Sequence, residues 1–138
     1  MKKIGVLFLL ALIFASCSND DEGETQSEGS IYGKWYQKES VINNVTFPYD
    51  DHEACGKDYI EFYDQNKVRS IDVWDCEEDL DWIGTFTKIE NTLTLYNGAE
   101  SRSFQIIELT TETFAYEYYL DDDRNGVEEH YVERFTRR

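Results

Sequence analysis

The sequence predicts an all-β domain, an eight-stranded antiparallel up-and-down β-barrel. From residue 31 onward, short runs rich in Val, Ile, Thr, Tyr, Phe and Trp alternate with turn residues, and no helical periodicity interrupts them. Short connections alternate with long ones, as in a meander with one closed and one open end. The chain is also 15% aromatic, which is too much apolar surface for a disordered polymer.

Eight strands are expected, at residues 33–42, 58–63, 67–74, 82–89, 92–96, 102–109, 113–120 and 127–136. The connections at 64–66, 90–91 and 110–112 are tight turns of two or three residues. Those at 43–57, 75–81, 97–101 and 121–126 are longer. We therefore expect all the short turns at one end of the barrel, the base, and all the long ones at the other end, the mouth.

The N-terminal residues 1–16 have the pattern of a secretory signal. Two lysines precede a mostly apolar run over residues 4–15, which is too short to span a bilayer, and Ser16 stands just before Cys17. Residues 14–17 resemble a bacterial lipobox, with Phe14 in place of the usual leucine. The resemblance implies a lipoprotein signal peptide cut before Cys17, whose sulfur carries a diacylglycerol.

Residues 18–29 contain five acids and no apolar side chain, so a flexible lipidated tether is expected over residues 17–30, before a barrel domain at 31–138. The early acidic run resembles the signal that exports Bacteroidetes-type lipoproteins to the outer face of the outer membrane. As a plain spacer it would leave the lipid-anchored protein on the periplasmic face.

The net charge limits the partners. It is −16 for the whole chain and becomes −18 when residues 1–16, with two lysines and no acid, are removed. Such a protein repels a phosphate backbone, so nucleic acid is excluded as a partner. No second hydrophobic segment follows the signal, so the lipid is the only expected membrane attachment, and a monomer is expected.

Two cysteines remain after Cys17 is assigned to the lipid. Cys55 and Cys76 form an even pair in an oxidising compartment, so they are predicted to be joined in a disulfide. Both lie in connections assigned to the mouth, so a bond between them is geometrically possible.

Gly33-Lys34-Trp35 has the Gly-x-Trp pattern that opens lipocalins. With the eight-strand meander, the long first loop and a late arginine, Arg134, the chain resembles the lipocalin-like domain of many Bacteroidetes lipoproteins over residues 31–136. The resemblance implies that Trp35 plugs the base of the barrel and that Arg134 lies across it, although Arg137 could serve instead. This pair is a structural plug rather than a binding site.

Side chains two residues apart share one face of a strand. This period gives nine candidates for the barrel interior and for ligand binding, Ile60, Phe62, Leu93, Leu95, Phe104, Ile106, Phe114, Tyr116 and Tyr118. An eight-stranded barrel is either filled by side chains or holds one small ligand, and the sequence leaves both readings open. It also leaves open which way five polar side chains point, those of Gln37, Glu39, Asp72, Glu108 and Glu133.

The mouth connections are strongly acidic. They contain twelve acids, Asp50, Asp51, Glu53, Asp75, Glu77, Glu78, Asp79, Asp81, Glu100, Asp121, Asp122 and Asp123, against two bases, Lys57 and Arg124. This charge provides solubility or, alternatively, captures a cation at the rim.

Calcium is the only cofactor that the sequence suggests. Asp121-x-Asp123-x-Asn125-Gly126 fits the first half of a calcium loop, although Val132 stands where the full pattern has a glutamate. An ordinary hairpin loop built on Asn125-Gly126 explains the same residues.

The sequence does not indicate an enzyme. His52 and His130 lie in a loop and a strand, with no serine or free cysteine in a nucleophile setting and no glycine-rich phosphate loop. We expect a non-catalytic, lipid-anchored, lipocalin-like protein that binds a small, largely apolar ligand in the barrel. The alternative is a filled barrel that acts as an interaction or accessory module through its acidic, calcium-binding mouth.

Overall fold

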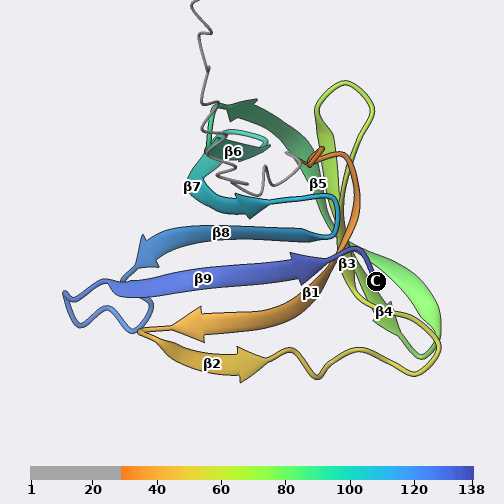
Figure 1. The fold of residues 1–138 in the computed structure, drawn as a ribbon, viewed down its shortest axis with the longest axis horizontal. Helices are drawn as coiled ribbons and strands as arrows, with labels where there is room; N and C mark the ends of the chain where they lie inside the picture. The colour runs from red at the N-terminus through yellow and green to blue at the C-terminus, as the bar shows by residue number, and fades with distance from the viewer. Residues whose placement is uncertain (1–28) are drawn as a thin grey trace, which may run out of the picture.

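The computed structural model describes residues 29–138, so the predicted signal peptide, Cys17 and the tether up to residue 28 lie outside the described part. The strands are β1 (Gly33–Ile42), β2 (Val45–Pro48), β3 (Tyr59–Tyr63), β4 (Lys67–Trp74), β5 (Glu77–Ile89), β6 (Thr92–Asn97), β7 (Glu100–Leu109), β8 (Thr113–Leu120) and β9 (Glu129–Thr136) (Figure 1). Within this part, no helix is long and apolar enough to cross a membrane.

Eight of these strands close into a barrel. Each of β3 to β9 pairs antiparallel with its neighbour in sequence, and β1 pairs with both β3 and β9. The predicted all-β, eight-stranded antiparallel up-and-down barrel is therefore confirmed, and β2 is an additional strand on the edge of β1.

Two of the four mouth connections are shorter than predicted. The β4–β5 connection is a two-residue turn in which Asp75 and Cys76 both have positive φ, 53° and 65°, and only Gly98 and Ala99 join β6 to β7. The loops expected at 75–81 and 97–101 were therefore wrong. Acids on the exposed face of a strand remain solvated, so an acidic segment does not have to be a loop.

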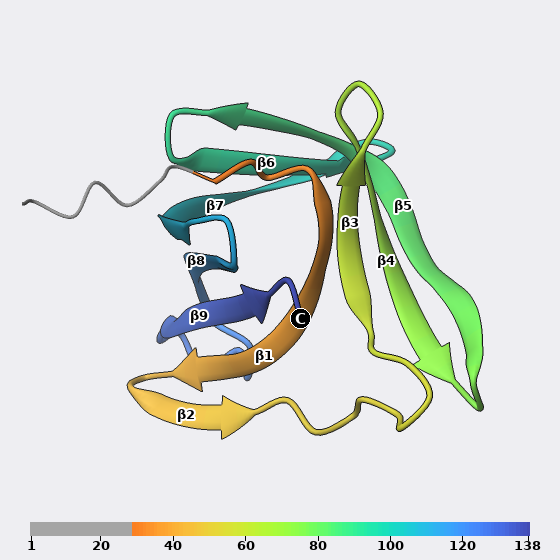
Figure 2. The same cartoon turned by 45° about the vertical axis from the view of Figure 1, so that its right-hand side comes forward.

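The predicted loop at 43–57 contains β2. Asn43 and Asn44 both adopt positive φ, 48° and 68°, which closes a two-residue hairpin between β1 and β2. β1 pairs with β3 only over residues 33–36, and beyond that point the same edge pairs with β2. The barrel is thus splayed at the mouth, and the chain after β2 crosses the gap to reach β3 (Figure 2).

The base half of the barrel is packed with side chains. Its largest fully buried side chains are those of Trp35, Phe62, Leu93, Phe114 and Val68, each less than 2% exposed. The rings of Phe62 and Phe114 meet edge to face at 6.0 Å, and the Trp35 indole N–H donates to the Ile31 carbonyl at 2.7 Å. This half is a dry core with its buried polar atom satisfied.

The first described residues are attached to the base of the barrel. The Gly29 N–H donates to the Leu109 carbonyl at 3.0 Å, and Ile31 is buried in the core. Leu109 precedes the β7–β8 turn, which is one of the base turns, so the chain enters the barrel at the base, opposite the mouth.

Arg137, and not Arg134, completes the base plug. The Arg137 guanidinium carbon lies 3.5 Å from the centre of the Trp35 ring, and its nitrogens donate to three carbonyls, those of Ser30, Tyr32 and Lys34. Arg134 instead pairs with Glu39 at 2.8 Å. The assignment of Arg134 to the plug was wrong because its neighbour Phe135 is buried in the core, so alternation along β9 turns Arg134 outward.

Gly33 is required beside this plug. It has φ of +110°, and a Cβ atom built on it would lie 2.5 Å from Arg137 Nη1. Any other residue would both strain the backbone and push the guanidinium off the tryptophan.

Candidate functional site

The mouth half of the barrel is hollow. It contains a cavity of about 780 Å³, within the range of small-molecule sites. Its apolar lining includes Ile60, Trp82, Leu95, Phe104, Tyr116 and Phe135. Since these belong to β3, β5, β6, β7, β8 and β9, the cavity lies inside the barrel above the packed base.

The nine residues expected in the interior divide between the two halves. Those in the packed core at the base are Phe62, Leu93, Ile106 and Phe114, and those that line the cavity are Ile60, Leu95, Phe104 and Tyr116. Phe104 also contributes to the core. Tyr118 packs against Phe104 and stacks on Tyr131 at 5.0 Å, but it is not part of the cavity wall. The barrel is therefore neither wholly filled nor wholly open.

Four carboxylates line the cavity, those of Asp51, Asp58, Asp72 and Asp81. Asp58 is buried: its Oδ1 accepts from the Val73 N–H at 2.7 Å, and its Oδ2 accepts from the Tyr49 hydroxyl. Desolvation, reinforced by the negative charge of Asp58, raises the pKa of the Asp72 carboxyl above its ordinary value.

His52 does not neutralise these acids. Its Nδ1 accepts a hydrogen bond from the Asp58 backbone N–H at 3.2 Å, and its Nε2 lies 2.8 Å from the Gln37 carbonyl. An imidazole nitrogen that accepts carries no proton, so this pattern assigns the neutral tautomer with its proton on Nε2. The 4.0 Å approach of Nδ1 to Asp58 is thus not an ion pair.

A further carboxylate, that of Glu133, lies behind the cavity wall and bonds to the lining residue Gln37. It accepts hydrogen bonds from Gln37, Ser40 and Tyr118, at 3.1, 2.5 and 3.2 Å. Burial raises the pKa of Glu133, and these three hydrogen bonds oppose the shift.

The structure shows where the five polar side chains point whose direction the sequence left open. Gln37 and Asp72 line the cavity, and Glu133 bonds to Gln37 beside it. Glu39 bonds to the outward-facing Arg134, and Glu108 accepts from Thr113 at an exposed position.

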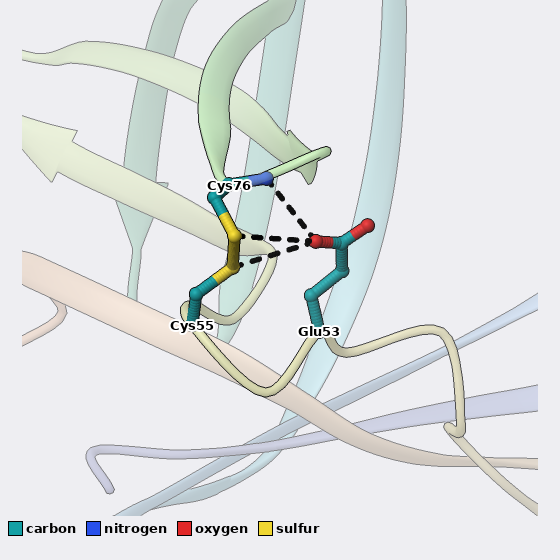
Figure 3. A group of neighbouring side chains, drawn as sticks. All are labelled: Glu53, Cys55 and Cys76. Atoms are coloured by element: carbon teal, nitrogen blue, oxygen red, sulfur yellow. Dashed lines mark hydrogen bonds between the residues drawn. A yellow bond between two sulfur atoms is a disulfide. The ribbon is translucent and has the colours of Figure 1, made fainter.

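Cys55 and Cys76 form the expected disulfide, with their Cα atoms 5.6 Å apart. Figure 3 shows Glu53 beside the bond, where its carboxylate accepts from the backbone N–H of Cys76 at 3.1 Å. The same carboxylate accepts from the backbone N–H of Asp75 at 3.0 Å. The loop that precedes β3 is therefore attached to the β4–β5 turn both covalently and by hydrogen bonds. Glu53, Cys55 and Cys76 are also the only cluster in residues 29–138 with metal-ligand spacing, and the disulfide leaves no thiolate to bind an ion.

The Asp121–Gly126 segment folds as a loop capped by its own side chains. Asp121 accepts from the backbone N–H groups of Asn125 and Gly126, each at 2.9 Å, and Asp123 accepts from that of Asn125 at 3.1 Å. Gly126 has φ of +87°. These are the bonds of a hairpin loop, and calcium binding there stays a prediction.

Sequence reasoning missed several cavity residues on strands whose alternation was ambiguous. The register leaves one residue unpaired in β1, Lys38, and one in β5, Asp81, so the period of two breaks at these two positions. The missed lining residues include Gln37, Ser70 and Trp82, and also Tyr49 from the crossing segment. A bulge leaves no distinct sequence signal in these strands.

Comparison with known proteins identifies the fold. Residues 31–116 match the sequence profile of the "Lipocalin-like domain" family. The crystal structure of a lipocalin-like protein from Bacteroides uniformis superposes with a TM-score of 0.54 at 12% identity, covering 80% of this chain and 99% of that one. An uncharacterised protein from Bacteroides eggerthii gives 0.55 at 12% identity, covering 77% and 99%. Aphrodisin, a sex pheromone from female hamster, gives 0.44 at 17% identity, covering 79% and 76%. No curated protein matches the chain.

Proposed function

The chain belongs to the family of lipocalin-like domains, and on that premise we propose that it is a non-catalytic protein that binds a small, largely apolar ligand inside its barrel. The observation that carries this proposal is the division of the interior into a packed base and a hollow mouth half of about 780 Å³. Burial of ligand surface against the apolar lining side chains would contribute about 25 cal/mol per Å².

The same division favours ligand binding over the filled-barrel alternative. In a filled barrel the side chains of Leu95 and Tyr116 would pack as tightly as those of Leu93 and Phe114. Leu93 and Phe114 are fully buried, whereas Leu95 and Tyr116 are partly exposed and line the cavity.

We also propose that the protein is a monomer anchored to the outer membrane by lipid on Cys17, and that it is exposed at the cell surface. The lipobox-like residues 14–17 and the acidic tether support this proposal. Because Gly29 joins the domain at the base, the mouth and its cavity would point away from the membrane.

Calcium binding at Asp121, Asp123 and Asn125 is a separate proposal, supported by oxygen ligands at alternate positions before a glycine. It predicts a rise in the melting temperature at millimolar calcium that the Asp121→Asn variant loses. An unchanged melting temperature of the unmodified chain would exclude the site.

A neutral apolar dye tests the proposed function. N-phenyl-1-naphthylamine, which fluoresces in apolar surroundings, is titrated into residues 18–138 produced in an oxidising compartment. Saturable one-to-one binding is expected. Leu95→Trp, which fills the cavity, should weaken it at least tenfold.

The matched control is Ile83→Trp, which adds the same ring to β5 at a side chain that is 51% exposed. It should leave the dye affinity within twofold. Absence of saturable binding, or equal losses in both variants, would refute binding in the cavity.

A further inference from the structure

The cavity combines an apolar floor with an acidic upper wall. Ile60, Leu95 and Phe104 lie at the floor, and the carboxylates of Asp51, Asp58, Asp72 and Asp81 join the same lining. Among residues 29–138, no lysine or arginine lines it. A concave surface with charges of one sign and low-dielectric walls concentrates its potential, so the interior is negative.

Several lysines and arginines around this part of the barrel have partners of their own, and Lys57 lies 5.7 Å from the centre of the Tyr36 ring. Lys34 lies 3.8 Å from the centre of the Tyr59 ring and 3.8 Å from Glu78, and Arg69 pairs with Glu61 at 2.6 Å. Arg102 stacks over the Tyr118 ring at 5.4 Å. None of the acids in the cavity wall has a cationic partner from the lining.

A single metal ion does not match this arrangement. In the described part of the chain, no three of the cavity carboxylates bring an oxygen each within 4.8 Å of one another. Carboxylates that are spread along a wall instead suit a larger cation that makes no coordination bonds. Aromatic faces of Tyr49, Trp82 and Tyr116 in the same lining offer it cation–π contacts.

We propose that the cavity selects an organic cation, a molecule whose apolar body packs on the floor while a protonated amine or quaternary ammonium group faces the aspartates. This inference rests on the proposed function, because it assigns the charge of the ligand that the cavity binds. Burial of the body provides affinity, and the aspartates discriminate against neutral and anionic molecules of the same shape.

Three ligands with one naphthyl ring test the inference by isothermal titration calorimetry. These are 2-(1-naphthyl)ethylamine, a cation at neutral pH, 2-(1-naphthyl)ethanol, which is neutral, and 1-naphthylacetate, an anion. The amine should bind at least tenfold more tightly than the alcohol, and the acetate more weakly than both. Asp72→Asn/Asp81→Asn should remove most of the preference for the amine over the alcohol.

The matched control is Glu77→Gln/Glu128→Gln, which removes the same two charges at exposed positions outside the cavity lining. It should keep the preference. Equal affinity for amine and alcohol would overturn the cation preference and leave the proposed function standing, and the absence of binding by all three would overturn both. If the control pair lowers amine affinity as much as the aspartate pair, net charge and not the cavity sets the preference, and the inference fails.

Discussion

Replacing Arg137 tests how the barrel is closed at its base. The Arg137 guanidinium covers Trp35, whose side chain is fully buried, and donates to the carbonyls of Ser30, Tyr32 and Lys34 at 2.8, 2.9 and 3.2 Å. Arg137→Ala removes the cover and all three bonds. Arg134→Ala, three positions away on the same chain segment, is the matched control.

The expected loss of stability in Arg137→Ala follows from the contacts that the side chain makes. A cation–π contact of this kind contributes about 0.5 to 2 kcal/mol. Hydrogen bonds from a charged donor contribute about 1.5 to 3 kcal/mol each when buried, but water can replace the arginine at the carbonyls once the base is open. Desolvation also lowers the pKa of Arg137, which shows that placing its charge here has a cost. We therefore expect Arg137→Ala to lower the free energy of unfolding by about 2 to 4 kcal/mol.

Arg134→Ala should cost less than about 1 kcal/mol, because its pair with Glu39 is partly exposed and screened. Equilibrium unfolding in urea, followed by tryptophan fluorescence, measures both variants, and Arg137→Lys should recover part of the loss. If Arg134→Ala were as destabilising as Arg137→Ala, the assignment of the plug to Arg137 would be incorrect.

Three further predictions concern the loop staple, the two halves of the barrel and the acidic wall. The disulfide joins residues 21 positions apart, so Cys55→Ser/Cys76→Ser should lower the free energy of unfolding by about 3 kcal/mol. Limited proteolysis of this variant should cut first at residues 49–58, and unchanged stability would contradict a stabilising role of the disulfide. Phe114→Ala should cost about 3 to 5 kcal/mol in urea unfolding, whereas Tyr116→Ala should act mainly on ligand affinity, and the reverse order would contradict the division of the interior. The pKa of Asp72 is raised in the folded state, so its contribution to stability is present at low pH and is lost as the pH rises through that pKa. Asp72→Asn should therefore have a higher melting temperature than the unmodified chain at pH 7 but not at about pH 3. Equal melting temperatures at both pH values would contradict the raised pKa.

The fold could be predicted because hydrophobic alternation holds wherever the strands are regular. Residues 104–106 and 114–116 follow the period of two with few interruptions, and Phe104, Ile106, Phe114 and Tyr116 all face the interior. The pairing of Cys55 with Cys76 followed from the even pair of cysteines left for an oxidising compartment, and it agrees with their positions in two connections at the mouth.

The site was less predictable, because its position depends on where alternation fails. The residues left over in the register, Lys38 in β1 and Asp81 in β5, interrupt alternation in those strands, so Asp81 joins the cavity lining next to Trp82. Arg137 lies just after the end of β9, where strand alternation does not predict the direction of a side chain. The prediction therefore assigned the plug to Arg134, which lies within the strand. The alternation of residues along a regular strand indicates which side chains share a face. The positions of bulges and of residues beyond the strand ends depend instead on tertiary contacts.

The most direct test of ligand binding in the mouth half is a nuclear magnetic resonance titration of residues 18–138 with N-phenyl-1-naphthylamine. Saturable shifts are expected for the methyl groups of Ile60 and Leu95, which line the cavity, whereas the indole N–H of Trp35 and the methyl groups of Leu93 in the packed base should stay in place. Saturation without shifts at Ile60 and Leu95, or shifts confined to the outer surface, would contradict a ligand site inside the barrel.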